Sequence, residues 1–201
     1  MDADQVATLR VLLAKTGWLE RAREFGRALR SSPRSPGGLL VVGTPDFEPW
    51  HLTAHLDEES RLSGRPALMP TLVRWSPPPG APPHLAVGLS RLEAAQRGET
   101  LFVVSEATAP VPLLERVNDA RHVGATILAL DGGEDPELEG LAHESLSAPS
   151  VVSFDATQHL VSAAAGGRDG DADGAARPAR GPRGLRDRVA RLLDIVSGPS
   201  A

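Results

Sequence analysis

The chain has 201 residues, of which 41% are hydrophobic, and its formal net charge at pH 7 is −5. This length supports one domain core with some chain left over for tails, and the acidic balance, without a basic cluster, argues against nucleic acid as a partner. The absence of cysteine excludes disulfides and thiolate metal sites. The N-terminus is acidic where a signal peptide is basic, and no apolar run is long enough to span a membrane, so we expect a cytoplasmic protein with no membrane partner.

The first part of the chain is predicted to be helical. Apolar residues recur at helical spacing over residues 4–30, which indicates a long helix with a break near Gly17. One small sheet cannot fully cover Trp18, Leu19 and Phe25, so we expect these side chains to stay on the surface of the domain. An apolar helix surface of this kind favours a homodimer or a higher homo-oligomer.

Short apolar runs predict five strands of a sheet that is buried on both faces. They are residues 39–43, 67–75, 101–105, 125–133 and 150–154. Pro70 suits the start or the edge of a strand, since proline cannot donate to a ladder. Helical patterns lie between the strands, at residues 49–62, 85–97, 111–122, 136–142 and 155–165. The alternation predicts an α/β fold, a three-layer sandwich with a doubly wound, mainly parallel five-stranded sheet.

Local signals indicate how these helices begin, end and pack. In the helix over residues 49–62, Trp50, Ala54 and Leu62 are spaced to share an apolar stripe. Gly64 and Gly124 lie where two of the helices would stop, and Asp155 is a suitable N-cap for the last one.

The C-terminal part differs in character from the α/β domain, which we assign to residues 1–165. Residues 166–183 are poor in apolar residues and predict a flexible linker. The DGDADG segment within it opens like a calcium-binding loop, but Arg180 stands where the bidentate glutamate is needed, so we expect no metal there.

Residues 184–197 predict an amphipathic helix that is ordered only when it is docked. Its own domain, a sister subunit or another protein could receive it, and the long polar linker favours another protein. The side chains expected to bind the partner form one apolar stripe: Leu185, Val189, Leu192, Leu193 and Val196.

The order of elements over residues 4–165 resembles the sugar isomerase (SIS) domain, in the compact form of the sedoheptulose-7-phosphate isomerases. The most specific segment is residues 98–133, where a turn, the strand TLFVVS, a helix and ILALDGG follow in the order of that family. The resemblance implies a nucleotide-binding-like α/β sandwich, usually a homodimer or homotetramer, that binds a phosphosugar. We expect no cofactor.

Two loops that bind phosphosugars in that family are altered here. The loop after the third strand has the family pattern S-x-S-G-x-S/T, and this sequence has SEATAP, with Ser105 in the first position and Pro110 in the last. Proline removes both a hydroxyl and an N–H donor, and Glu106 adds negative charge. The loop after the first strand, GTPDF, keeps Gly43 of the family pattern G-x-G-x-S. The residues that could still contact a ligand are Gly43, Thr44, Ser105, Thr108 and Gln158.

Two histidines are candidates for catalysis. His51 and His55 lie one helical turn apart, as imidazoles that share a zinc ion do, but Leu52 stands where a zinc metalloprotease has glutamate. The resemblance implies that His55 replaces a catalytic glutamate, and that His159 lies on a closing helix that approaches the site of a neighbouring subunit. The alternative is that both are solvated, interface or structural histidines. We expect no metal site.

The sequence therefore favours a non-catalytic, degenerate SIS-like domain that acts as an oligomerising, ligand-sensing or protein-recruiting scaffold. The alternative is a phosphosugar isomerase or sugar-phosphate-binding protein with a rebuilt site that uses His55, His159 and Ser105. A nucleotide-dependent oxidoreductase is disfavoured because the Rossmann glycine fingerprint is missing.

Overall fold

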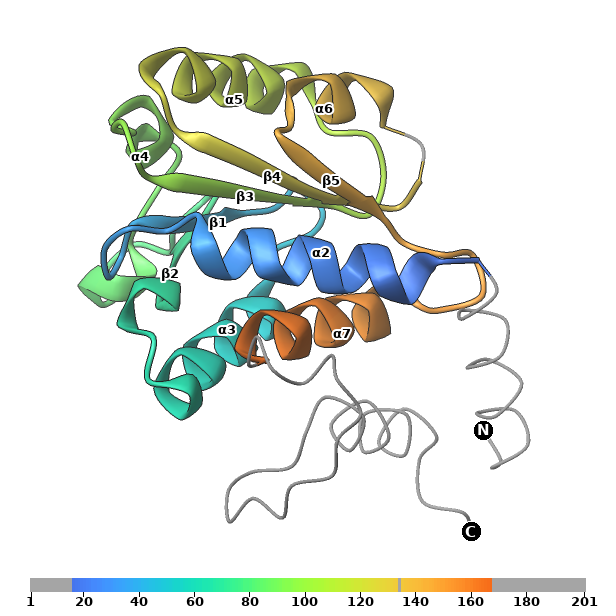
Figure 1. Cartoon of the computed structure of the whole chain (residues 1–201). Coiled ribbons are helices and arrows are strands. Elements are labelled where there is room, and N and C mark those ends of the chain that lie inside the picture. Colours follow the sequence, from blue (N-terminus) through green and yellow to red (C-terminus); the bar gives the residue numbers. More distant parts are fainter. Residues whose placement is uncertain (1–15, 134, 168–201) are drawn as a thin grey trace, which may run out of the picture.

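The computed structural model describes residues 16–133 and 135–167. This part of the chain forms a parallel five-stranded sheet in the order β2-β1-β3-β4-β5, with helices on both faces (Figure 1). The strands are β1 (Leu39–Val42), β2 (Pro70–Val73), β3 (Thr100–Ser105), β4 (Thr126–Asp131) and β5 (Glu144–Ser147). The predicted α/β sandwich is thereby confirmed. The strand order reverses between β1 and β3, and ligands of such sheets bind at the carboxyl ends of the strands beside that point.

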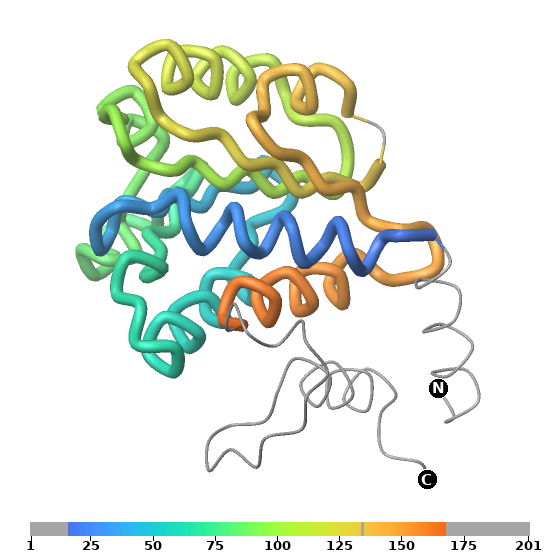
Figure 2. The backbone as a smooth tube through the Cα atoms, in the orientation of Figure 1, coloured from blue at the N-terminus to red at the C-terminus, as the bar shows by residue number. Residues whose placement is uncertain are grey.

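Two layers of helices cover the sheet (Figures 1 and 2). One layer consists of α2 (Trp18–Ser31), α3 (Trp50–Ser63) and α7 (Phe154–Gly166). The other contains α4 (Ser90–Glu93), α5 (Val111–Val123) and α6 (Pro136–Leu141). Two short 3-10 turns, η1 (Pro66–Leu68) and η2 (Pro83–Leu85), flank β2 and α4.

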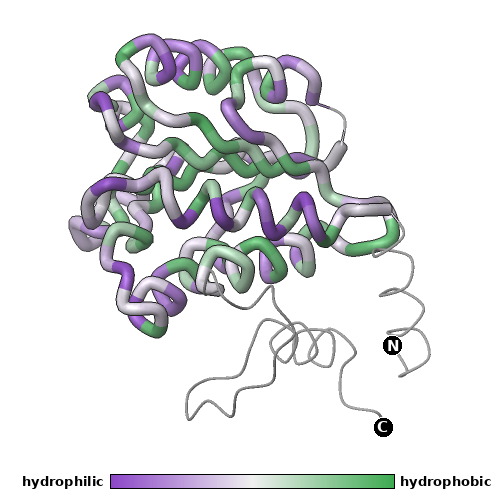
Figure 3. The backbone as a smooth tube through the Cα atoms, viewed as in Figure 1, coloured by the Kyte–Doolittle hydropathy of each residue, from purple (hydrophilic) through white to green (hydrophobic). Residues whose placement is uncertain are grey.

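Alternation along the central strands divides the core into two clusters, one on each face of the sheet. Leu39 and Val41 of β1 face the α2, α3 and α7 layer, whereas Leu40 and Val42 face the α5 layer. The central strands are therefore apolar on both sides, as a buried parallel sheet requires, and Figure 3 shows them mostly in the hydrophobic colour.

Several local predictions are confirmed. Helix α2 begins directly after Gly17, which has a φ of 68°, while the part of the predicted helix before the break lies outside the described residues. Gly64 and Gly124 end α3 and α5 in the left-handed conformation, with φ values of 67° and 96°. Pro70 is the first residue of β2, an edge strand.

The expectation that the aromatic residues of α2 are exposed is wrong. Trp18 and Phe25 are each only 2% exposed, and Leu19 is partly buried against the core. The Trp18 indole Nε1 donates to the Ser147 carbonyl of β5 at 2.8 Å, and the ring of Phe25 lies 5.7 Å from that of Phe102 in β3. Because α2 lies directly on the sheet, its apolar stripe is satisfied within the monomer.

The apolar stripe expected on α3 is also wrong. The buried residues of this helix are Leu52, Leu56 and Ser60, whereas Trp50 is 40% and Leu62 is 53% exposed. The stripe that starts at Leu52 faces the sheet, so the stripe that starts at Trp50 points outward. The Arg74 guanidinium covers the Trp50 ring instead, at 4.5 Å from its centroid.

Residues 85–97 do not form the single helix that was predicted. The segment contains the end of η2 and one turn of α4. The backbone of this segment pairs with the end of β2, since the Arg74 N–H donates to the Val87 carbonyl at 2.8 Å. That pairing holds the chain extended before α4 begins.

The fifth strand was predicted six residues too late along the chain. Residues 150–154 form a turn and the start of α7, and β5 is the polar segment Glu144–Ser147. An edge strand needs few apolar side chains, and Leu146 is the buried residue of β5. Ser153, not Asp155, caps α7, because its hydroxyl accepts from the Ala156 N–H at 3.2 Å.

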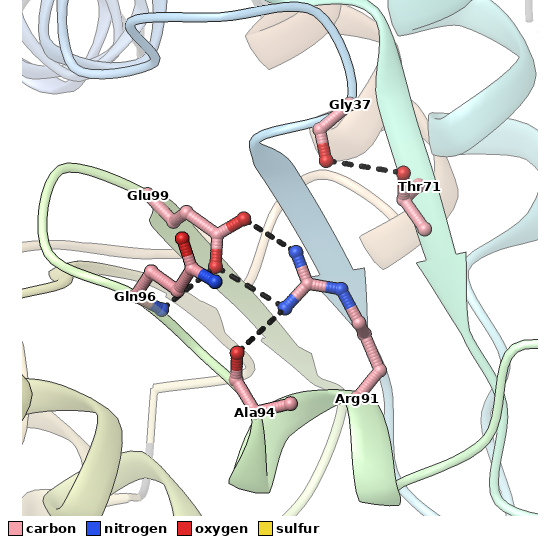
Figure 4. A network of polar contacts seen from close by, with 6 residues as sticks. All are labelled: Gly37, Thr71, Arg91, Ala94, Gln96 and Glu99. Atoms are coloured by element: carbon pink, nitrogen blue, oxygen red, sulfur yellow. Dashed lines mark hydrogen bonds and ion pairs between the residues drawn. The ribbon is translucent and has the colours of Figure 1, made fainter.

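Polar contacts tie together the amino-terminal edge of the sheet, where β3 begins (Figure 4). Arg91 of α4 pairs with Glu99 just before β3, and the same carboxylate accepts from the Gln96 N–H at 2.8 Å. Beside it, the Thr71 hydroxyl of β2 donates to the Gly37 carbonyl at 3.3 Å. The Arg91–Glu99 ion pair therefore lies at the end of the sheet away from the ligand-binding edge, whereas Arg74 and Glu48 form an ion pair at 2.9 Å beside the carboxyl ends of β2 and β1.

No helix among the described residues is long and apolar enough to cross a membrane. Helix α7 runs to Gly166, the first residue of the predicted linker. Three predicted parts lie outside the described residues: residues 168–183 of the linker, the helix over residues 184–197 with its stripe, and residues 4–15 of the first helix.

Candidate functional site

The loops after β1 and β3 meet at the carboxyl edge of the sheet, beside the point where the strand order reverses. They enclose an open pocket of about 310 Å³. Its lining comes from these two loops: Thr44, Pro45, Asp46, Phe47, Glu106, Ala107, Thr108 and Pro110. Thr44 and Thr108, two of the predicted ligand residues, therefore lie together in one pocket.

The loop after β1 forms a tight turn that uses its own donors. The Thr44 N–H donates to the Phe47 carbonyl at 3.0 Å, and the Phe47 N–H donates back at 3.2 Å. A Cβ at Gly43 would lie 1.9 Å from the Phe47 carbonyl oxygen, so only glycine fits there. The Gly43 carbonyl accepts from the Trp75 indole at 2.8 Å. Gly43 thus shapes this turn.

The loop after β3 is held by one contact within the loop and by one contact with Asp135. Ser105 is fully buried, and its hydroxyl donates to the Ala107 carbonyl. The Ala109 N–H donates to the Asp135 carboxylate at 2.6 Å, and Pro110 has no N–H to offer. Ser105 therefore lies beneath the pocket, where it braces the loop.

Asp135 was not a candidate of the sequence analysis. It is 4% exposed and also caps α6, because its other oxygen accepts from the Leu138 N–H at 3.1 Å. The signal for it was present, since an aspartate directly before a proline is a common helix start. Its contact with Ala109, 26 residues earlier, could be found only from the fold.

The charge of the pocket is negative. Asp46 and Glu106 are exposed carboxylates in its lining, and that lining, as far as the described residues form it, contains no arginine, lysine or histidine. Behind the pocket, burial raises the pKa of Asp131 at the end of β4, although hydrogen bonds from Gly133 and Ser147 oppose the shift. An anion in the pocket would meet two carboxylates and no cation of the lining.

The structure brings three histidines together away from this lining. We call His51 and His55 of α3 with His159 of α7 the histidine cluster. The ring of His159 lies 4.3 Å from that of His55 and 6.1 Å from that of His51, and the two α3 rings are 6.4 Å apart. The sequence analysis grouped His55 and His159 with Ser105 in one rebuilt site, whereas the structure brings these two histidines to His51 through the packing of α3 on α7.

The hydrogen bonding of His159 is incomplete. Its Nδ1 atom is buried and has no hydrogen-bond partner among the described residues. Burial lowers the pKa of His159, the nearby His55 adds to this effect, and Asp155 opposes it. His55 has a carboxylate within reach, since its Nδ1 lies 3.8 Å from Glu58. His159 is therefore held in its neutral form near pH 7.

Gln158, the last of the predicted ligand residues, is 2% exposed on α7. Its Nε2 makes long contacts with the Phe154 carbonyl and the Asp155 carboxylate, at 3.5 and 3.4 Å. Its Oε1 has no partner among the residues that the structure describes. Within residues 16–133 and 135–167, no three His, Asp or Glu side chains are arranged to hold one metal ion.

Of the comparisons with known proteins, the one with solved structures supports the fold. No family model and no curated protein matches the sequence. Among solved structures, a candidate phosphosugar isomerase from Silicibacter pomeroyi DSS-3 is 14% identical over 92% of this chain, with a TM-score of 0.54. A candidate sugar-binding protein from Salmonella typhimurium LT2 is 14% identical over 96% of this chain, with a TM-score of 0.55.

The present chain spans about half the length of those two proteins, 51% and 53%. At this level of identity the likeness concerns the backbone. The chain has the α/β fold of the sugar isomerase (SIS) domain.

Proposed function

We propose that this domain is a non-catalytic SIS-like domain that acts in the cytoplasm as an oligomerising, ligand-sensing or protein-recruiting scaffold. One observation carries the proposal: four donors of the two loops at the carboxyl edge of the sheet, the N–H groups of Thr44, Phe47 and Ala109 and the Ser105 hydroxyl, already donate to protein oxygens, and the pocket between the loops carries Asp46 and Glu106. A phosphate dianion needs several converging donors, each worth about 1.5–3 kcal/mol when the hydrogen bond is charge-assisted. Here the donors that are already used are not available to the dianion, and the two carboxylates repel it.

Calorimetric titration with a panel of sugar phosphates tests this proposal. We expect no binding at micromolar concentration. As a positive comparison, the variant Ala107→Ser with Thr108→Gly and Pro110→Thr restores the S-x-S-G-x-S/T pattern. Micromolar binding by the unmodified protein would contradict the proposal, whatever the variant does.

The second candidate function is a phosphosugar isomerase with a rebuilt site, and the histidine cluster favours it. Sugar isomerisation moves a proton between neighbouring carbons, which needs a group that is neutral at the working pH and can accept a proton. His159 meets that requirement and lies 4.3 Å, ring to ring, from His55. Turnover of a heptulose or hexose phosphate that is lost in both His55→Ala and His159→Ala would establish this function. His122→Ala, an exposed histidine on α5, is the matched control.

Self-association remains part of the proposal, although the exposed apolar surface of α2 on which it was first based is not present. Trp18 and Phe25 are buried within the monomer, so they are not available to a partner. The support is now the family resemblance, which implies a dimer or tetramer. Light scattering at micromolar concentration should give at least a dimer mass, and a monomer mass would contradict this part of the proposal.

A further inference from the structure

The pocket between the loops after β1 and β3 contains polar side chains that the protein itself does not use. Thr44 and Thr108 contribute one hydroxyl from each loop, and Asp46 and Glu106 contribute one carboxylate from each loop. None of these four side chains makes a hydrogen bond or an ion pair with the part of the chain that the structure describes. They are therefore available to a ligand at the edge of the sheet where ligands of this architecture bind.

Thr44 indicates a ligand more directly than the other three. It is only 7% exposed, yet its hydroxyl has no hydrogen-bond partner among the described residues. The unpartnered side-chain atoms that are shut off from solvent in residues 16–133 and 135–167 are Thr100 Oγ1, Gln158 Oε1 and His159 Nδ1. The Thr44 hydroxyl is not one of them, so it is open to solvent, and the pocket is the space that Thr44 lines. A hydroxyl in so buried a residue needs a partner, which a molecule in the pocket would supply.

The charges around the pocket favour a cation. Asp46 and Glu106 in the lining are unpaired with any described residue. Arg74, which follows β2 at the same edge of the sheet, does not offset them. Its guanidinium pairs with Glu48 at 2.9 Å and lies over the Trp50 ring. The two carboxylates of the lining therefore attract a positive group and repel a negative one.

The start of α5, which adjoins the pocket at Pro110, does little to attract an anion. A helix N-terminus binds anions through free N–H groups. Pro110 and Pro112 have no N–H, and the N–H groups of Leu113 and Leu114 both donate to the Pro110 carbonyl, at 2.8 and 3.2 Å. The helix therefore does not replace the donors that the two loops lack.

The rest of the lining suits an organic ligand better than a metal ion. Pro45, Phe47, Ala107 and Pro110 form apolar walls, and the volume of about 310 Å³ is in the range of small-molecule sites. No three His, Asp or Glu side chains of the described ranges are arranged to hold a metal ion. A ligand with an ammonium group, hydroxyls and a short carbon chain matches the carboxylates, the threonines and the apolar walls.

We propose that this pocket binds a small organic cation, an amino polyol that carries an ammonium group and no phosphate. The ammonium group pairs with the carboxylates of Asp46 and Glu106, and the ligand hydroxyls form hydrogen bonds with Thr44 and Thr108. This inference rests on the proposed function, since it names the ligand class for the ligand-sensing role of the domain.

Calorimetric titration of the full chain with three matched polyols tests the inference. Glucamine has an ammonium group where sorbitol has a hydroxyl, and sorbitol 6-phosphate adds a phosphate to the same carbon chain. We expect glucamine to bind at millimolar concentration, sorbitol to bind at least about tenfold more weakly, and sorbitol 6-phosphate not to bind. Added salt should weaken the binding of glucamine, because exposed carboxylates are screened.

The three ligands separate a failure of this inference from a failure of the proposed function. No binding of glucamine, or equal binding of glucamine and sorbitol, would overturn the inference and leave the proposed function intact. Binding of Ca²⁺ without binding of glucamine would assign the carboxylates to a metal ion and would also overturn the inference. Micromolar binding of sorbitol 6-phosphate would contradict both.

Substitutions of the carboxylates show whether glucamine binds in this pocket. Asp46→Asn with Glu106→Gln should weaken its binding at least about tenfold. The matched control, Asp119→Asn with Glu144→Gln, makes the same change of charge at exposed positions in the second half of α5 and at the start of β5. This control should bind glucamine as the unmodified protein does. Equal losses in the two variants would mean that the ligand responds to the overall charge of the protein, which would overturn the inference.

The substitution Thr44→Val tests the buried hydroxyl, because valine keeps the shape of threonine. Binding of glucamine should weaken by about tenfold, the loss of one hydrogen bond. The melting temperature should not fall, since the Thr44 hydroxyl has no partner among the described residues. Unchanged affinity together with a lower melting temperature would show that this hydroxyl stabilises the fold, and would contradict its assignment to the ligand.

Discussion

The contact between α2 and α7 has its closest point at Gly26, and the substitution Gly26→Ala probes it. A Cβ at this position would lie 2.5 Å from the Ala164 Cβ, 2.7 Å from the Ala164 carbonyl carbon and 3.0 Å from the Ala165 nitrogen. Carbon atoms pack best at about 3.5–4.0 Å, so the two helices would have to separate by roughly 1 Å. Since two of the three obstructing atoms belong to the backbone of α7, no side-chain rotation relieves the overlap.

The sign of the effect follows from two opposing contributions. Alanine is favoured over glycine inside a helix by about 0.8–1.0 kcal/mol, which alone would stabilise the protein. Overpacking costs about 1–3 kcal/mol, and the backbone obstruction places Gly26→Ala near the upper end of that range. We expect a net loss of about 2 kcal/mol in the free energy of unfolding, or roughly 4–8 °C in the melting temperature of a domain of this size.

Thermal and urea unfolding, followed by circular dichroism, measure this loss. Gly140→Ala in α6 is the matched control, because it is also a helical glycine but nothing lies within 4 Å of its added Cβ. It should be neutral or stabilising by up to about 1 kcal/mol. If Gly26→Ala melted at or above the temperature of the unmodified protein while the control behaved as expected, α2 and α7 could not pack as described.

Three further predictions concern the site. The pKa of His159 is lowered in the folded state, so the stability that its neutral form contributes is complete above the ordinary pKa of 6.5 and is lost as the pH falls below that value. His159→Gln should therefore flatten the pH dependence of the free energy of unfolding below pH 6.5. An unchanged pH profile would contradict the burial of this imidazole. Asp135→Ala should cost about 1–3 kcal/mol of stability by freeing the buried Ala109 N–H, whereas Asp135→Asn should retain most of it in urea unfolding. Asp46→Asn with Glu106→Gln should strengthen binding of inorganic phosphate measured by calorimetry, and unchanged affinity would show that charge is not what excludes the anion.

Local signals in the sequence determined much of the fold. The apolar runs of β1 and β3 predicted buried parallel strands, because both faces of these strands meet a helix layer. Helix ends were marked by Gly17, Gly64 and Gly124, because glycine adopts the left-handed conformation without strain. The same reasoning failed for β5, because an edge strand with one buried residue carries almost no apolar signal. The altered loops were also evident from sequence, since proline and carboxylates have fixed chemistry wherever they lie.

Only the tertiary structure decided which faces meet. The pattern of α2 showed an apolar stripe but not whether the sheet or another subunit covers it. The stripe predicted on α3 ran through Trp50, whereas the sheet buries the one through Leu52. His55 and His159 are separated by more than a hundred residues in sequence, and their rings lie 4.3 Å apart because α3 and α7 pack side by side. Hydrophobic periodicity records that a side chain is buried, while the identity of the neighbour that buries it depends on the arrangement of the whole chain.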